Sequence, residues 1–351
     1  MTAAAAACGT GAGTETRANG KLAFTVAVIE PDLTTVPVLA AAEAVRRQGH
    51  DVEIVELAEP ELAIEGLAQG DYAISAEATG PALSAVEQGA PIKIIADVVG
   101  NQWALYGRKG VSSCDELGGR PFGIFSEGAV ATAISKDWVR STCKGDERPD
   151  YLTIGGSDVR AQALVSGEID ATPLEVSDAV ALESSGSPAA ASLTKVADFA
   201  KTLPDLHPQT VYANADFLGD HRGVAQEFVT ALVREHARIN ARPQRLVELA
   251  RTHLPEEDEG DVGRVAERYR DARLFDAAAL TPRNVQGTID FFARAGVIGR
   301  GVRAEEAADL SFIREAARET ASRDTRKTAS RDTASRETPP RGKSGRLKGA
   351  S

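Results

Sequence analysis

Apolar residues along the chain alternate between the two-residue period of strands and the 3.6-residue period of helices. The first such pair is the β-rich run 21–32 and the helical pattern 34–49. The pattern continues, in chain order, with strand 50–57, helix 61–70, strand 71–76, helix 79–89 and strand 91–99. Because strands and helices alternate, we expect a parallel sheet with helices on its faces.

The alternation restarts with a fresh set of units near residues 105–120. These units are strand 120–125, helix 126–143, strand 151–156, helix 157–168 and strand 169–176. A restart of this kind predicts two similar α/β lobes rather than one long sheet. Later in the chain, 221–243 carries apolar residues near helical spacing, and the final third is predicted to be a helical layer.

The composition is that of an ordinary globular protein. The 351 residues are 42% hydrophobic and 26% charged. No run approaches the roughly 18 apolar residues that a membrane helix needs, so we do not expect an integral membrane protein. The net charge of −11 argues against nucleic acid as a partner, because such binding requires lysine and arginine to neutralise phosphates.

Both ends of the chain differ in composition from the middle. Residues 319–351 hold nine Lys or Arg and four Asp or Glu, and they contain the degenerate repeat ASRDT, ASRDT, ASRET. Since such a segment has few apolar side chains to bury, we expect a disordered basic tail that is solvated rather than bound to nucleic acid or an anionic surface. Residues 1–20 are expected to be a disordered tether.

Cysteines and histidines do not form a recognisable metal or redox motif. The three cysteines are too few and too scattered for a zinc site or a CxxC pair, and the five histidines show no HExxH spacing. We therefore predict no metal and no cofactor. Cys114 and Cys143 are expected to be free buried thiols, the alternative being a disulfide within one lobe if the chain is exported.

Three stretches of the sequence resemble one family of binding proteins. They are "LAQGDYAISAEATGPALSAVEQGAPIKIIADV" (67–98), "RKGVSSCDELGGRPFGIFSEGAVATA" (108–133) and "LVSGEIDATPLEV" (164–176). In order and spacing they are similar to the type II periplasmic solute-binding proteins of the sulfonate, taurine, nitrate and thiamine-precursor group, the NMT1/THI5-like proteins. The resemblance spans about residues 21–300.

The resemblance implies an α/β fold with two lobes and a ligand cleft between them. Lobe 1 would comprise 21–104 and the returning C-terminal helices 205–318, and lobe 2 would comprise 105–204. It further implies a monomeric ABC-transporter substrate-binding protein with a permease as its partner. Lobe closure would capture a small organic solute, such as a sulfonate, a pyrimidine or a related nitrogen or sulfur compound.

The loop "FSEGA" is the most informative candidate for ligand contact. Ser126 supplies a hydroxyl, Glu127 follows it, and Gly128 lets a ligand approach the backbone at the start of the predicted helix. Ligands of open α/β sheets bind at the carboxyl ends of strands, where helix N-termini present free N–H groups. The alternative is that Ser126 only caps its own helix.

Other loops at strand ends supply further candidates for ligand contact. Thr34 and Thr35 can contact a ligand or, more simply, cap the helix that follows them. Thr79 lies in the equivalent loop after the strand 71–76. Gln102 and Trp103 follow the strand 91–99, and the Trp103 ring either stacks on a planar ligand or belongs to the core.

Three acidic residues also lie in these loops: Asp32, Glu77 and Glu175. If they face the cleft, the ligand has a cationic or hydrogen-bond-donor group rather than being a bare sulfonate or nitrate, because like charge beside an anion is costly. This favours an amine-bearing or neutral heterocycle, or a zwitterion. Placement on the surface is the simpler interpretation of each acid taken alone.

An enzyme on the same fold is the alternative function. "GIFSEG" lacks the first glycine of a nucleophile elbow, since Ile124 stands in its place. "GTGAG" (9–13) follows no strand and is not a dinucleotide fingerprint. No Ser-His-Asp or Cys-His set is evident, so no catalytic residue is predicted. Cytosolic menaquinone-pathway enzymes and thiamine-pyrimidine synthases share the fold, although the cysteine cluster of the latter is missing.

The segment around Cys8 bears on the compartment. Cys8 follows an alanine run and precedes a small-residue linker, as at the end of a lipoprotein signal, but the charged and apolar parts of a signal are absent. If the true start lies upstream of Met1, we expect an extracytoplasmic protein whose membrane contact is a lipid on Cys8. Otherwise the protein is expected to be cytoplasmic.

Overall fold

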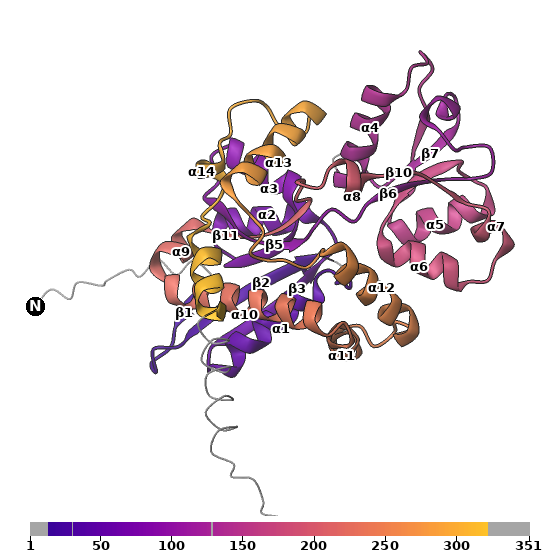
Figure 1. The fold of residues 1–351 in the computed structure, drawn as a ribbon. Helices are drawn as coiled ribbons and strands as arrows, with labels where there is room; N and C mark the ends of the chain where they lie inside the picture. Colours follow the sequence, from indigo (N-terminus) through magenta and orange to yellow (C-terminus); the bar gives the residue numbers. More distant parts are fainter. Residues whose placement is uncertain (1–12, 30, 128, 322–351) are drawn as a thin grey trace, which may run out of the picture.

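The computed structural model of the chain describes residues 13–29, 31–127 and 129–321. Within these ranges the strands form two sheets, each with its own helices, and Figure 1 shows them as two bodies. We call them lobe 1, built on the six-stranded sheet, and lobe 2, built on the five-stranded sheet. The mixed α/β architecture with two lobes confirms the predicted fold class.

The lobe 1 sheet is mixed: two of its pairings are parallel, as the alternating pattern predicts, and three are antiparallel. Its strands are β1 (Thr14–Thr16), β2 (Leu22–Ile29), β3 (Asp51–Leu57), β4 (Ile74–Ala78), β5 (Ile92–Val99) and β11 (Gln209–Asn214). Strands β3 and β4 flank β2 in parallel. Strand β11 returns from lobe 2 and lies antiparallel between β4 and β5, a placement that the sequence pattern does not predict.

Helices cover both faces of this sheet (Figure 1). Helices α2 and α3 lie on one face, and α1 lies on the other beneath α10. The stripe on α10 packs as predicted, with Phe228, Leu232 and Ile239 fully buried. The bounds of the lobe 1 helices are α1 Val36–Arg47, α2 Pro60–Gln69, α3 Thr79–Glu87, α9 Ala215–Asp220, α10 Arg222–Ala241, α11 Gln244–His253, α12 Glu259–Ala272, α13 Pro282–Ala295 and α14 Ala304–Ala307.

Lobe 2 has shorter strands. They are ordered β10 (Thr194–Asp198), β6 (Ala104–Gly107), β9 (Ala171–Leu174), β7 (Pro121–Ile124) and β8 (Asp150–Thr153). Strands β6 and β10 were not predicted from the pattern, and they are antiparallel to their neighbours. The helical elements of lobe 2 are the 3-10 turn Cys114–Leu117, α4 Val130–Thr142, α5 Ser157–Ser166, α6 Val176–Ser184, α7 Pro188–Ala191 and α8 Phe199–Thr202.

The chain crosses between the sheets twice. The first crossing, residues 100–103, joins β5 to β6, and the second crossing, residues 199–208, joins β10 to β11. Asn101 Nδ2 donates to the Phe199 carbonyl at 3.0 Å, and the Phe199 amide donates to the Trp103 carbonyl at 3.1 Å. The two crossings are therefore bonded to each other. The predicted domain limits at residues 104 and 204 stay predictions.

The predicted disorder at the two ends needs correction where the structure describes them. Strand β1 pairs antiparallel with β2 across a tight turn, so 14–16 belong to the sheet and not to a tether. Residues 311–321 are helical, with Phe312 and Ile313 buried, so the tail does not begin at 319. Backbone pairing with β2 holds the first segment, and burial of Phe312 and Ile313 stabilises the second. Residues 1–12 and 322–351 lie outside the described residues.

Candidate functional site

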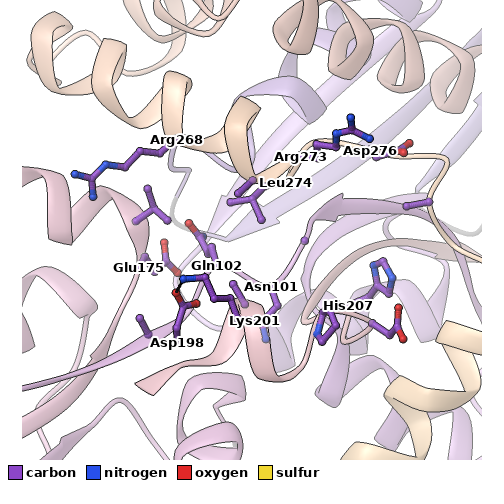
Figure 2. A pocket seen from close by; sticks show the side chains of 18 of the residues that line it. Asn101, Gln102, Glu175, Asp198, Lys201, His207, Arg268, Arg273, Leu274 and Asp276 are labelled. Atoms are coloured by element: carbon purple, nitrogen blue, oxygen red, sulfur yellow. Dashed lines mark ion pairs between the residues drawn. The ribbon is translucent and has the colours of Figure 1, made fainter. Parts of the chain in front are cut away.

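A cavity of about 620 Å³ lies where the two lobes meet (Figure 2). Its walls come from the end of β5, both crossings, the start of α6, and the segment 268–284 that runs from α12 to α13. The volume falls within the roughly 300–1,000 Å³ that small-molecule sites usually have. Its size is thus suitable for a small molecule, and its walls come from parts of the chain that are far apart in sequence.

A buried Asp–His–Asn chain forms one wall of this cavity. His207 Nδ1 lies 3.0 Å from an Asp97 carboxylate oxygen, and both residues are buried. Asn284 Nδ2 lies 2.8 Å from His207 Nε2. Asn284 Oδ1 is already occupied, because it accepts from the Thr281 amide at 2.6 Å. The amide group of Asn284 must then face His207 Nε2 with its NH₂ end, so Nε2 accepts and Nδ1 carries the proton.

The pKa directions of this pair follow from burial and mutual attraction. Burial raises the pKa of Asp97, although His207 opposes part of that effect. Burial lowers the pKa of His207, but the Asp97 charge and hydrogen bond outweigh it, so the pKa is raised overall. The pair links the end of β5 to the second crossing, which fixes one side of the hinge between the lobes.

Glu175 lies at the opposite side of the cavity, immediately before α6. The Glu175 amide donates to Asp178 Oδ2 at 2.9 Å, which fixes the start of the helix. The pKa of Glu175 is raised well above its usual 4.5, first by burial and then by the charges of Asp32, Asp178 and Glu77; Arg160 opposes them. Four carboxyl groups from both lobes therefore share one electrostatic environment.

Asp32 contributes to this environment from lobe 1. Its Oδ1 accepts from the Thr34 amide at 2.8 Å, the Thr34 hydroxyl at 2.6 Å and the Thr35 amide at 3.0 Å. Burial nevertheless raises the pKa of Asp32, against the effect of these bonds. Thr35 stands at the N-cap position of α1, as one of the two predicted caps, but its side chain makes no cap bond to the helix; the hydroxyl instead accepts from the Asp32 amide at 2.9 Å.

Arg160 is the cation that lowers the pKa of Glu175, but its guanidinium forms hydrogen bonds with other groups. It is 1% exposed and donates to Thr172 Oγ1 at 3.1 Å, to the Pro173 carbonyl at 3.3 Å and to the Gly155 carbonyl. Burial lowers its pKa, and the charges of neighbouring acids oppose that effect. Arg160 thus holds the β9 end of lobe 2 in place.

The side-chain oxygen of Gln102 has a hydrogen-bond partner, and its side-chain nitrogen has none. Tyr269 on α12 donates its hydroxyl to Gln102 Oε1 at 2.8 Å. Gln102 Nε2 has no hydrogen-bond partner, although the residue is only 3% exposed and lines the cavity. Burial raises the pKa of Tyr269, and the charges of Glu175, Asp32 and Asp178 add to it. Tyr269 and Gln102 therefore lie close to the carboxyl groups.

Other predicted ligand contacts have structural roles in this conformation. Thr79 donates its hydroxyl to the His207 carbonyl at 2.8 Å, and its amide donates to the Pro208 carbonyl. Trp103 packs in the main core and does not line the cavity, which favours the core interpretation. Glu77 lies on β4, where Gln209 Nε2 donates to its carboxylate at 3.5 Å. Glu77 is half-buried, so the structure does not give it the surface placement that was the simpler expectation.

The loop after β7 differs from the expectation. Helix α4 begins at Val130 with Ala129 as its N-cap, four residues later than predicted, so Ser126 neither caps it nor starts it. Glu127 is exposed and forms an ion pair with Lys136. Neither Ser126 nor Glu127 lines the cavity. Gly128 lies outside the described residues, as does Cys8, so their predicted roles stay predictions.

Among the described lysines and arginines that line the cavity, Lys195, Lys201 and Arg268 have acidic partners of their own. Lys201 lies 3.1 Å from an Asp198 carboxylate oxygen, and Lys195 lies 3.9 Å from the same oxygen. Arg268 pairs with Glu183 on α6, and Figure 2 shows its guanidinium extending away from Glu175. Arg273 lies on the other side of the cavity, near Asp276 in this view. Within this wall, Glu175 is not paired with any described cation.

The lobes also touch outside the cavity. Glu183 and Ser184 at the end of α6 meet Arg268 and Asp261 on α12, where Ser184 Oγ donates to Asp261 at 2.8 Å. On the other side, Arg140 on α4 donates to the Arg294 carbonyl on α13 at 3.0 Å. The cavity is thus flanked by two contacts between the lobes.

Cys114 and Cys143 form a disulfide, with their Cα atoms 5.0 Å apart. The expectation of free thiols is therefore wrong. The turn 114–117 and the end of α4 bring the two residues together, and spacing in the sequence could not reveal this. No group of three or more potential metal ligands occurs in 13–29, 31–127 or 129–321. None of the helices described is long and apolar enough to span a membrane.

Sequence reasoning missed several residues of the site. Asp97, His207, Tyr269 and Asn284 come from four separate elements, and no local motif connects them. Asn101 directly precedes the predicted residue Gln102, but its role in joining the crossings is not evident from the sequence. Of the residues that the strand-end rule predicts to contact a ligand, Gln102 and Glu175 line the cavity, and their contact with a ligand stays a prediction.

Comparison with known proteins gives a consistent result. A family model described as NMT1/THI5 like matches residues 45–246, more than half of the chain. A search of the curated proteins found no match. Among solved structures, the ligand-binding component of an ABC-type import system from Staphylococcus aureus, with zinc bound, is 15% identical; the match covers 83% of this chain and 98% of that one, with a TM-score of 0.67.

Two further structures share the fold. The periplasmic aliphatic sulphonate binding protein from Escherichia coli is 14% identical, over 82% of this chain and 92% of that one, with a TM-score of 0.61. The periplasmic nitrate-binding protein from Synechocystis is 12% identical, over 84% and 88%, with a TM-score of 0.64. The chain has the periplasmic-binding-protein fold and belongs to the NMT1/THI5-like family.

Proposed function

We propose that the protein is the solute-binding component of an ABC importer. It captures a small organic molecule between its lobes and delivers it, as a monomer, to a membrane permease. Membership of the NMT1/THI5-like family and the fold shared with sulphonate- and nitrate-binding proteins support this role. We propose that the solute is a sulfonate, a pyrimidine or a related organic compound of nitrogen or sulfur.

The cavity between the lobes is the observation that carries the proposal. It is formed by both crossings and by walls from each lobe, so its volume changes when the lobes move about the crossings. A solute that touches both lobes stabilises the closed arrangement by the contacts it makes only there. This is the mechanism by which a two-lobe binding protein signals that it is loaded.

An extracytoplasmic location is part of the proposal. The disulfide between Cys114 and Cys143 supports it, because disulfides persist in oxidising compartments and are rare in the cytosol. Proteins of the same fold from Escherichia coli and Synechocystis are described as periplasmic. A lipid on Cys8 would then retain the protein at the membrane surface.

The enzyme alternative has one observation in its favour, the Asp97–His207 pair at the cavity. An acid–histidine pair activates a nucleophile in many hydrolases. However, none of the described residues lining the cavity is a Ser, Thr or Cys, and His207 Nε2 is already occupied by Asn284. The geometry therefore favours a pair that stabilises the hinge, and binding without turnover.

A thermal-shift screen of the full chain tests the proposed function. Sulfonates, nitrate, pyrimidines, amino acids and polyamines are added separately, and each hit is recovered and analysed by mass spectrometry. Concentration-dependent stabilisation with the compound unchanged is the expected result. A compound that is consumed would instead establish the enzyme alternative.

A further inference from the structure

We infer that the solute carries a positive charge, on an amine, an amidine or a protonated ring nitrogen, and that this end lies against Glu175, which lines the cavity and has no ion pair with a described cation. The inference rests on the proposed function and specifies the substrate class of the same site. It does not follow from the structural relatives, since two of them are described as binding sulphonate and nitrate, which are anions.

The balance of charge around Glu175 is the first argument. Asp32, Glu77 and Asp178 all act on Glu175, and Arg160 is the one cation among the principal groups that do. Arg160 is bonded to two backbone carbonyls and a hydroxyl, so it is not available to a ligand. Like charges confined together are unfavourable unless a counter-charge arrives. A cationic ligand supplies that counter-charge.

The start of α6 is the second argument. A free helix N-terminus is a ready site for an anion, because its N–H groups and its dipole attract negative charge. Here the chain's own carboxyl groups occupy that position, since Asp178 accepts from the Glu175 amide at 2.9 Å. An anionic ligand would have to displace or face two carboxylates, whereas a cation would be attracted to both.

Unpartnered polar atoms at the cavity end of lobe 1 are the third argument. Gln102 Nε2 and Gln209 Oε1 lack hydrogen-bond partners, and their side chains are 3% and 6% exposed. Buried polar groups in native proteins are bonded in the large majority of cases. Gln102 also lines the cavity beside Glu175 (Figure 2). Its NH₂ group suits an acceptor atom on a ligand whose cationic end meets the carboxyl groups.

Two matched panels of compounds test the inference on the full chain. One panel holds small primary amines, amidines and aminopyrimidines, including benzamidine. The other holds the corresponding carboxylates, sulfonates and nitrate, including benzoate, which has the shape of benzamidine with the opposite charge. Thermal shift is measured at pH 7.5 in low salt, and hits are confirmed by isothermal titration calorimetry.

Hits confined to the cationic panel support the inference. Hits confined to the anionic panel overturn it while leaving the proposed function intact. Stabilisation by neither panel overturns the inference, and the proposed function is overturned as well only if the wider thermal-shift screen also finds no stabilising compound. These three outcomes separate an error in the charge of the solute from an error in the role of the protein.

Variants then locate the charge. Glu175→Gln keeps the shape of the side chain and removes its charge, and it is expected to weaken a cationic hit about 10- to 100-fold, as for the loss of a charged hydrogen bond. Glu168→Gln, an exposed residue of lobe 2, is the control and is expected to leave the affinity unchanged. Equal affinity in the two variants would contradict the assignment to Glu175.

Discussion

Two carboxyl groups at the same cavity, Asp97 and Glu175, have opposite surroundings. Asp97 is 1% exposed and lies 3.0 Å from His207, whose other ring nitrogen is held by Asn284. Glu175 is only partly buried, has no ion pair with a described residue, and lies among other acids. A carboxyl group that the chain has paired serves the fold, and one that the chain leaves unpaired, at a cost to the free protein, is the candidate for binding.

Asp97→Ala should show the largest effect on folding. Removing the carboxylate leaves the buried Nδ1–H of His207 without its acceptor, and a hydrogen bond to a charged group contributes about 1.5–3 kcal/mol. We therefore expect the free energy of unfolding, measured by urea denaturation, to fall by that amount. Asp220→Ala, an exposed position of lobe 1, is the control and should change it by less than about 0.5 kcal/mol. A loss below about 1 kcal/mol for Asp97→Ala would show that the pair does not stabilise the hinge.

Glu175→Gln should show the reverse pattern. The affinity for a cationic solute should fall by about 1.5–3 kcal/mol, the usual contribution of a hydrogen bond to a charged group. The free energy of unfolding without ligand should not fall at pH 7.5, since the variant removes a carboxylate that other acids repel. Calorimetry and urea denaturation on the same preparation measure both quantities. A drop in stability with unchanged affinity would place Glu175 with Asp97 as a structural residue.

Asn284→Asp sharpens the assignment of the proton on His207. In the native chain the Asn284 amide donates to Nε2, so nitrogen NMR should show Nε2 without a proton at pH 7.5. The variant replaces that donor with a carboxylate, which should protonate Nε2 and raise the pKa of His207 further. A native spectrum with both ring nitrogens protonated would contradict the bonding scheme. The expected loss of stability is about 1–2 kcal/mol.

The smallest effect is the pH dependence of the ligand-free protein. The pKa values of Glu175 and Asp32 are raised on folding, so their contribution to stability is fully present below the unfolded values, near 4.5 and 3.8, and is lost as the pH rises through the folded values. The melting temperature should therefore decrease from pH 5 towards pH 8. Each loss of 1 kcal/mol in the free energy of unfolding lowers it by about 2–4 °C. Glu175→Gln should flatten this slope. An unchanged slope in the variant would show that Glu175 is not the group that titrates.

The sequence was sufficient for the order of elements and for part of the site. The spacing of apolar residues and the glycines and prolines at the ends of elements are local signals. They identified most strands and helices of both lobes. The rule that ligands bind at the carboxyl ends of strands includes Gln102 and Glu175 among its candidates, and both line the cavity. Strand β11 could not be predicted in its antiparallel position, because its partners are more than 100 residues away in the chain.

The remaining errors have physical causes that a local pattern does not contain. Ser126 has the right residue type for a cap, but the chain makes an extra turn before α4 begins at Val130. The Asp32 carboxylate bonds the Thr34 and Thr35 amides, and the Thr35 hydroxyl bonds the Asp32 backbone instead of the first turn of α1. The disulfide depends on the approach of a 3-10 turn to the end of α4, 29 residues later.

The central claim is that a cationic solute meets the Glu175 carboxylate between the lobes. Its most direct test is calorimetric titration of a confirmed cationic hit at pH 6, in buffers of different ionisation enthalpy, for the native chain and Glu175→Gln. Because the pKa of Glu175 is raised without ligand, cation binding should release protons from the native protein, and the release should be smaller in the variant. Proton uptake on binding, or equal release from both proteins, would contradict the claim.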